Sequence, residues 1–148
     1  MKFLIVGTGS IGRRHFKNIL SLGGHHVAVV RSKRNMDAPQ REFFAKYRPQ
    51  VFYNLKAALA KKPDAVLVCN PTSLHVSTAR AAIRADAHVF VEKPISHTRF
   101  PAHIANDLGK RGRSKLTENI QRNTKFYLSN NTSRHNGKEA ARKTNSLE

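Results

Sequence analysis

Apolar residues in the first two thirds of the chain form short unbroken runs, and these alternate with stretches in which apolar positions recur every three or four residues. Short runs rich in valine and isoleucine are typical of strands buried on both faces of a sheet. The wider spacing is typical of helices with one buried side. The alternation predicts an α/β fold with a doubly wound parallel sheet and right-handed crossovers. The expected strands are residues 3–6, 27–30, 51–53, 65–69 and 88–91, and the expected helices are 11–20, 39–48, 55–60 and 76–83.

The helical spacing also predicts which side chains face the sheet and how two helices begin. Pro39 is expected in the first turn of its helix, where no amide partner is needed. Thr72 or Ser73 is expected to cap the helix at 76–83, since a hydroxyl can accept a hydrogen bond from a free amide. The residues expected to face the sheet are Ile11, Phe16, Ile19 and Leu20 in the first helix and Val76, Ala79, Ala82 and Ile83 in the last.

The first strand runs into the glycine pattern Gly7-x-Gly9-x-x-Gly12, after which the first helix continues. In this context the first glycine permits a tight turn, the second lets the backbone approach a pyrophosphate, and the third lets the helix pack close to the sheet. The amides at the start of a helix lack partners within it and attract anions. The pattern predicts a dinucleotide-binding loop, and the alternative is an ordinary tight turn without a ligand.

The tip of the second strand is basic. Arg31, Ser32, Lys33 and Arg34 follow the strand, and no acidic residue occurs before Asp37. At this place in dinucleotide folds an acid binds the 2′-hydroxyl of the adenosine ribose, whereas basic or hydroxyl side chains hold a 2′-phosphate. We therefore expect NADP(H) to be preferred over NAD(H), with Arg31 and Ser32 as the selecting residues. Lys33 and Arg34 are equally well explained as a solvated loop.

The fourth and fifth strands both end in polar residues at the edge where parallel sheets bind their ligands. Asn70 to His75 follow the fourth strand, and Glu92-Lys93-Pro94 follow the fifth. His75 is explained either by contact with a nucleotide or by partly exposed packing in the first turn of a helix. Lys93 precedes a proline and is expected on rigid, extended backbone. That position suits a group that binds a ribose hydroxyl or polarises a substrate oxygen, although an exposed lysine without a role is the usual alternative.

Three segments together resemble the cofactor domain of the Gfo/Idh/MocA oxidoreductases, the family of glucose-fructose oxidoreductase and inositol 2-dehydrogenase: GTGSIGRRH at 7–15, CNPTSLH at 69–75 and AHVFVEKPIS at 87–96. The resemblance implies a Rossmann fold over residues 1–96 and hydride transfer between a nicotinamide and a carbinol carbon of a sugar or polyol. It also implies that Lys93 contacts the nicotinamide ribose and is the catalytic residue. The cofactor-binding residues implied by the resemblance are Gly7, Gly9, Ser10, Ile11, Gly12, Asn70, Thr72, His75, Glu92, Lys93 and Pro94.

Composition narrows the classes of protein to consider. The net charge of +18, from 27 Lys and Arg against 9 Asp and Glu, raises nucleic acid as a partner. No nucleic-acid-binding motif accompanies the charge, so only nonspecific adsorption is expected. The single cysteine, Cys69, excludes an internal disulfide and is expected to be a small buried hydrophobe. No stretch predicts a signal peptide or membrane span, and no histidine or acid shows metal-ligand spacing. We expect a cytoplasmic protein without a metal site.

The pattern changes after Ser96. Valine occurs ten times up to this residue and never afterwards, and the apolar count falls from 45 of 96 residues to 13 of 52. We expect residues 97–128 to hold a final helix and strand, and 129–148 to be a disordered basic tail. Members of the family continue into a large α+β substrate domain. We expect an interrupted gene more than a natural short form, and little turnover by this chain alone. The alternative function is a structural or regulatory dinucleotide-binding module without catalysis, in which copies pair through the exposed sheet edge.

Overall fold

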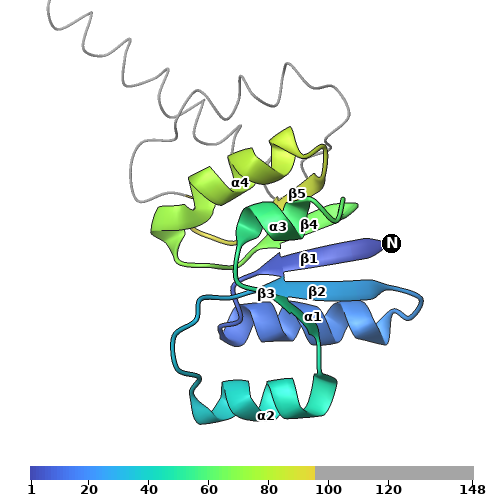
Figure 1. Cartoon of the computed structure of the whole chain (residues 1–148), viewed down its shortest axis with the longest axis vertical. Coiled ribbons are helices and arrows are strands. Elements are labelled where there is room, and N and C mark those ends of the chain that lie inside the picture. The colour runs from blue at the N-terminus through green and yellow to red at the C-terminus, as the bar shows by residue number, and fades with distance from the viewer. Residues whose placement is uncertain (96–148) are drawn as a thin grey trace, which may run out of the picture. The chain divides into compact units, whose positions relative to one another are not determined.

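Five parallel strands form one sheet in the order β3-β2-β1-β4-β5 (Figure 1). The computed structural model describes residues 1–95, so the predictions for 97–128 and 129–148 lie outside the described residues. The chain steps outward from β1 to β3 and then returns to the other side of β1. This order confirms the predicted doubly wound α/β fold and puts its switch point between β1 and β4. The strands are β1 (Lys2–Val6), β2 (His26–Val30), β3 (Gln50–Phe52), β4 (Ala65–Val68) and β5 (His88–Val91).

Helices cover both faces of the sheet. α1 and α2 lie on one side, and α3 and α4 lie on the other (Figure 1). This division follows from right-handed crossovers, because the connection from β3 to β4 runs in the direction opposite to the two before it. The helices are α1 (Ser10–Ser21), α2 (Ala38–Tyr47), α3 (Leu55–Leu59) and α4 (His75–Arg84), and a short 3₁₀ turn, η1 (Thr72–Leu74), precedes α4.

The core on the α1 and α2 side is rich in aromatic rings. Phe16 of α1 meets Phe43 of α2 edge to face, with ring centroids 4.9 Å apart, and both pack against Ile5 at the centre of the sheet. Ile19 is buried as predicted, but Leu20 is 39% exposed. The prediction for Leu20 was wrong because Gly12, Phe16 and Ile19 already define the buried stripe, and the next residue points about 100° away from it.

On the opposite face, small side chains let α4 lie close to β4 and β5. Ala79, Ala82 and Ile83 are buried as predicted. Val76 is only half-buried. Thr78 is buried instead, and its hydroxyl accepts a hydrogen bond from the side-chain nitrogen of Asn70 at 2.9 Å. Burying each large aliphatic side chain contributes about 1.5–3 kcal/mol.

The starts of α2 and α4 differ. Asp37 caps α2 by accepting a hydrogen bond from the backbone of Gln40 in a full capping box, and a proline stands in the first turn as predicted. At α4 the N-cap residue is Leu74, and no side chain caps the helix. The expected cap by Thr72 or Ser73 was wrong, because these residues form the 3₁₀ turn and lie too early to reach the first amides of α4.

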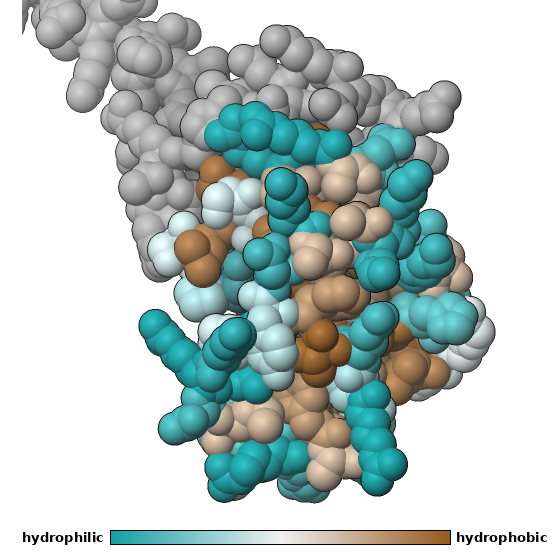
Figure 2. Space-filling view, in the orientation of Figure 1, coloured by the Kyte–Doolittle hydropathy of each residue, from teal (hydrophilic) through white to brown (hydrophobic). Residues whose placement is uncertain are grey.

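The face shown in Figure 2 is largely hydrophilic, and apolar residues are visible in gaps between polar side chains. Among residues 1–95, no helix has the length and apolar character needed to cross a membrane.

Candidate functional site

The carboxyl ends of four strands bring the predicted site residues to one edge of the sheet. Val6 of β1 is in register with Val30 of β2 and with Val68 of β4, and Val68 is in register with Val91 of β5. The loops that follow these residues begin with Gly7, Arg31, Cys69 and Glu92 respectively. Segments far apart in the sequence are therefore neighbours at this edge.

Two of the three loop glycines are required by close backbone contacts. Gly7 has φ +104°, and a Cβ there would lie 2.6 Å from the backbone of Cys69 and Asn70. A Cβ on Gly12 would lie 2.0 Å from the carbonyl oxygen of Gly7. No side chain fits at either distance, so these glycines let the loop lie against the backbone that follows β4 and let α1 lie directly on the loop.

Gly9 has the opposite environment, because a Cβ there would meet no atom within 4 Å. It is the N-cap of α1 and makes no side-chain cap, and no acidic residue occupies the first turn. Arg13 donates the first regular helical bond, to the Gly9 carbonyl at 3.0 Å. The amides of Ser10 and Ile11 precede it in the exposed end of the helix, which makes this a site suited to an anion.

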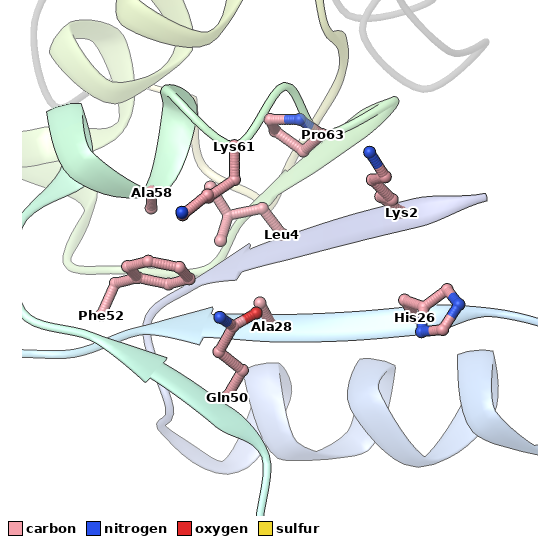
Figure 3. Close-up of a pocket in the computed structure, with 9 residues that line it drawn as sticks. All are labelled: Lys2, Leu4, His26, Ala28, Gln50, Phe52, Ala58, Lys61 and Pro63. Carbon is pink, nitrogen blue, oxygen red and sulfur yellow. The ribbon is translucent and has the colours of Figure 1, made fainter.

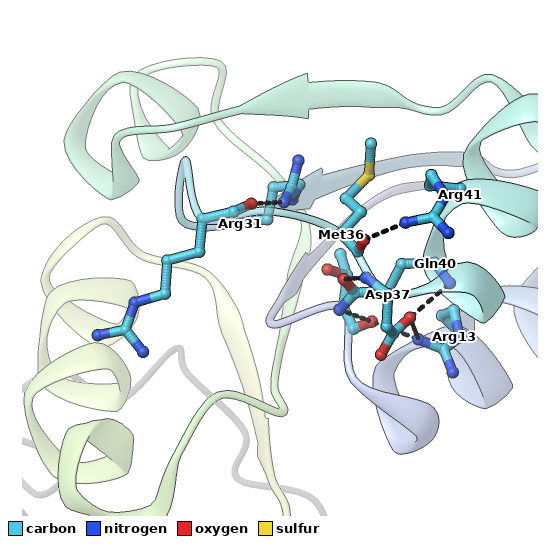
Figure 4. Close-up of polar contacts among 8 residues, drawn as sticks. Arg13, Arg31, Met36, Asp37, Gln40 and Arg41 are labelled. Atoms are coloured by element: carbon cyan, nitrogen blue, oxygen red, sulfur yellow. Dashed lines mark hydrogen bonds and ion pairs between the residues drawn. The ribbon is translucent and has the colours of Figure 1, made fainter.

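The glycine loop is braced by the start of α2 (Figure 4). The carbonyl oxygen of Thr8 accepts hydrogen bonds from Arg13 at 3.1 Å and from the side chain of Gln40 at 3.3 Å. A guanidinium nitrogen of Arg13 also lies 4.0 Å from the Asp37 carboxylate. The loop and the segment after β2 are thus fixed to each other by side chains.

At the tip of β2, Arg31 folds back over α2. Its guanidinium lies 5.5 Å from the centre of the Phe44 ring and donates to the carbonyl of Arg34. Ser32 is exposed beside it. The first carboxylate after the strand, Asp37, is engaged in capping α2.

At the tip of β4, His75 is buried and not partly exposed. Its side chain lies with Nε2 2.7 Å from the carbonyl oxygen of Asn70 and Nδ1 2.9 Å from that of Pro94, and the residue is 2% exposed. The side-chain oxygen of Asn70 is buried and has no hydrogen-bond partner among the described residues. Thr72 is half-buried in η1.

At the tip of β5, Glu92 pairs with a histidine of α1. Nε2 of His15 lies 2.5 Å from Oε1 of Glu92. Lys93 is exposed, and the chain bends there before a cis bond to Pro94.

Two titratable groups at this edge are shifted. Burial raises the pKa of Glu92, but hydrogen bonds from His15 and the Lys93 amide, together with the charges of His15 and Arg14, outweigh it and hold the pKa below its usual value. Burial and the nearby Glu92 carboxylate raise the pKa of Cys69 to about 12. The carboxylate is thus a stable acceptor, and the thiol is not a nucleophile at neutral pH.

Residues 1–112 match the oxidoreductase family Gfo/Idh/MocA, described by its NAD-binding Rossmann fold. The chain belongs to this family. Relatives include an inositol 2-dehydrogenase/D-chiro-inositol 3-dehydrogenase of Halalkalibacterium halodurans, 35% identical over 100 residues that make up 66% of this chain and 29% of that protein. A 4-carboxy-2-hydroxymuconate-6-semialdehyde dehydrogenase of a Sphingobium species is 32% identical over 98 residues, 65% of this chain and 30% of that protein. This chain therefore spans about three tenths of these relatives.

Solved structures of similar proteins show the same fold. UDP-N-acetylglucosamine 3-dehydrogenase GnnA from Acidithiobacillus ferrooxidans superposes with a TM-score of 0.63 at 27% identity, over 82% of this chain and 39% of that one. GenD2 from gentamicin A biosynthesis, solved in complex with NAD, gives a TM-score of 0.65 at 25% identity, over 78% of this chain and 33% of that one.

Within this Gfo/Idh/MocA domain, several contacts at the edge could not be predicted from the sequence. No local pattern marks the hydrogen bond from the Gln40 side chain to the Thr8 carbonyl, or the one between the side chains of Asn70 and Thr78. His15 stands inside the quoted GTGSIGRRH segment, but its partner Glu92 is 77 residues away. The sequence signal was that the segments GTGSIGRRH and AHVFVEKPIS occur in the same chain. This signal did not reveal that the side chains of His15 and Glu92 contact each other.

The family domain also has a cavity of about 350 Å³ elsewhere (Figure 3). It lies over β1, β2 and β3 on the α3 side, and none of the loops at the carboxyl edge lines it. It is therefore separate from the predicted cofactor site. Within residues 1–95, no three histidine, cysteine or acidic side chains are grouped so that they could hold a metal ion. The lining residues are Lys2, Leu4, His26, Ala28, Gln50, Phe52, Ala58, Lys61 and Pro63.

Proposed function

We propose that this chain is the cofactor-binding part of a nicotinamide-dependent oxidoreductase that acts on a CH–OH group of a sugar or polyol. The observation that carries the proposal is the open backbone at Gly9 at the same sheet edge as the exposed Lys93. Membership of the family and likeness to inositol dehydrogenases support the substrate class.

We also propose a cytoplasmic location, and pairing of two copies through β5, which has one neighbour among the described strands.

The glycine loop fits a pyrophosphate. The space beside Gly9 leaves room for it, and the free amides of Ser10 and Ile11 donate to its oxygens. Gly7 and Gly12 bring the loop and helix close enough for those amides to converge. This part of the site binds through the backbone, so its strength depends on shape more than on side-chain identity.

The loops after β4 and β5 fit the nicotinamide end. Asn70 and Thr72 line this side, and Glu92 and Pro94 flank Lys93 at the tip. A bound nicotinamide supplies the carbon that accepts or donates a hydride. The ammonium of Lys93 donates a hydrogen bond to the nicotinamide ribose and polarises a substrate oxygen. Because hydride transfer requires a substrate held in line with the ring, we propose that this chain alone gives little turnover.

The test of cofactor binding is a calorimetric titration of the full chain with NADPH and NADH. We expect at least one to bind below millimolar concentration, and binding of neither would contradict the proposal. Gly9→Ala should weaken binding by placing a methyl group in the pyrophosphate space. Lys17→Ala is the matched control, because Lys17 is exposed on α1 away from the loop.

We propose further that NADP(H) is preferred, through Arg31 and Ser32. Support comes from the engagement of Asp37 in capping α2, which leaves no free carboxylate between residues 31 and 41 to bind a 2′-hydroxyl. Arg31→Asp should shift the ratio of affinities toward NADH by about tenfold or more. Lys33→Asp makes the same charge change two residues further along the loop and should shift the ratio less. Equal shifts would reject Arg31 as the selecting residue.

A further inference from the structure

The turn that carries Lys93 is held from both faces of the sheet. From α1, Nε2 of His15 lies 2.5 Å from Oε1 of Glu92, the residue before Lys93. From α4, Nδ1 of His75 lies 2.9 Å from the carbonyl oxygen of Pro94, the residue after it. The backbone on each side of Lys93 is therefore tied to a different helix.

The Glu92 carboxylate passes the restraint from α1 to the backbone of Lys93. Its second oxygen, Oε2, accepts a hydrogen bond from the Lys93 amide at 3.3 Å. The side chains of His15 and Glu92 are 20% and 23% exposed, and the edge of the His15 ring packs against Phe90 with centroids 5.3 Å apart. A hydrogen bond to a charged group in so sheltered a place is stronger than one in water.

The charges around the pair keep Glu92 ionised. Arg14 and His15 of α1 and the Lys93 amide favour the carboxylate over its protonated form, and together they outweigh the effect of burial on its pKa. The thiol of Cys69, whose pKa burial and the Glu92 carboxylate raise to about 12, stays neutral. Glu92 is thus a permanent acceptor at neutral pH, available to His15 and to the Lys93 amide at once.

We propose that His15 is a positioning residue for Lys93: by holding Glu92, it fixes the backbone from which the Lys93 ammonium reaches the nicotinamide ribose. The second part of this statement rests on the proposed cofactor site. His15 itself has its Nε2 turned to Glu92 and its ring against Phe90, so it acts through Glu92 and not by contact with the cofactor.

The first experiment measures the restraint without any ligand, by amide hydrogen exchange of Lys93 in the full chain. His15→Phe keeps the aromatic packing but removes the donor, and exchange at Lys93 should become about tenfold faster. His15→Gln keeps a nitrogen near the position of Nε2 and should restore slow exchange. Glu92→Ala removes the acceptor of the same pair, and exchange at Lys93 should become faster by a similar factor. Unchanged exchange in both His15→Phe and Glu92→Ala would overturn the proposal.

The second experiment asks whether the restraint serves the nicotinamide end. Binding is measured for NADH or NADPH, whichever binds the wild type better, and for the corresponding ADP or 2′-phospho-ADP, which lacks the nicotinamide and its ribose. His15→Phe should weaken the dinucleotide about tenfold and leave the shorter nucleotide unchanged, with rescue by His15→Gln. An equal loss for both ligands would indicate a merely structural role and contradict the proposal.

A double-mutant cycle completes the test. If His15 acts through Lys93, Lys93→Ala should weaken the dinucleotide in the wild type and add little in His15→Phe. Fully additive losses would overturn the proposal. Failure of the wild type to bind any dinucleotide would instead reject the proposed function, while the exchange experiment would still decide whether His15 restrains the Lys93 backbone.

Discussion

The glycine loop and the Lys93 turn lie at the same sheet edge, but they are built in different ways. The loop gets its shape from backbone packed on backbone, with Gly12 directly on the carbonyl of Gly7. The turn gets its shape from side chains, one histidine from each face of the sheet. Backbone contact tolerates no change of residue, whereas side-chain contacts tolerate replacements that keep the donor. Each of the following experiments tests this contrast.

The largest effect is expected at Gly12. Gly12→Ala places a methyl group 2.0 Å from a carbonyl oxygen, so α1 must move, and we expect a loss of about 3 kcal/mol in unfolding free energy. Gly9→Ala has open space around the new methyl group and should cost less than about 1 kcal/mol, the usual penalty of alanine at an N-cap. Chemical denaturation of both variants measures the difference, and equal losses would contradict the backbone account of the loop.

The next effect is expected at His75. His75→Leu removes a buried imidazole whose ring nitrogens lie 2.7 and 2.9 Å from the carbonyl oxygens of Asn70 and Pro94, and we expect a loss of about 2 kcal/mol in unfolding free energy. His26→Leu is the control, because His26 is exposed at the start of β2. A variant at His75 as stable as the control would show that the turn does not depend on this histidine.

A smaller effect is expected where α2 begins. Asp37→Ala removes the capping oxygen that accepts from Gln40 and should cost about 1 kcal/mol. Glu42→Ala, at an exposed position of the same helix, should be nearly neutral. Thermal unfolding of the two variants distinguishes the loss of the helix cap from a general effect of removing an acidic side chain.

The smallest effect is the pH dependence contributed by Glu92. Its pKa is lower in the folded protein than its usual 4.5. The folded state therefore binds this proton less readily than the unfolded chain, and the stabilisation is present above pH 4.5 and is lost as the pH falls through the folded pKa. Glu92→Gln should lose less stability than the wild type between pH 6 and the acid limit. The unfolding free energy of both proteins is measured by urea denaturation at several pH values in this range. An equal change with pH in the two proteins would contradict the lowered pKa of Glu92.

The same contrast explains what could be predicted from the sequence. The glycine loop, the alternation of strands and helices and the buried faces follow from local residue patterns, because each depends on neighbours in the chain. The partnership of His15 with Glu92 does not, since it depends on which helix the finished sheet puts beside β5. The burial of His75 was missed for a similar reason: the oxygens that lie close to its two ring nitrogens belong to backbone carbonyls, which every residue has, so no residue type marks them.

The single thiol of the chain makes this edge observable. Cys69 follows β4 between the glycine loop and Glu92, and with a pKa of about 12 it is almost wholly protonated at neutral pH. Alkylating reagents attack the thiolate, so labelling of the folded protein is slow and speeds up when local unfolding exposes the thiol to water. The rate of labelling by iodoacetamide therefore reports opening of the dinucleotide edge, and a ligand that closes it should slow the reaction in an otherwise unmodified protein.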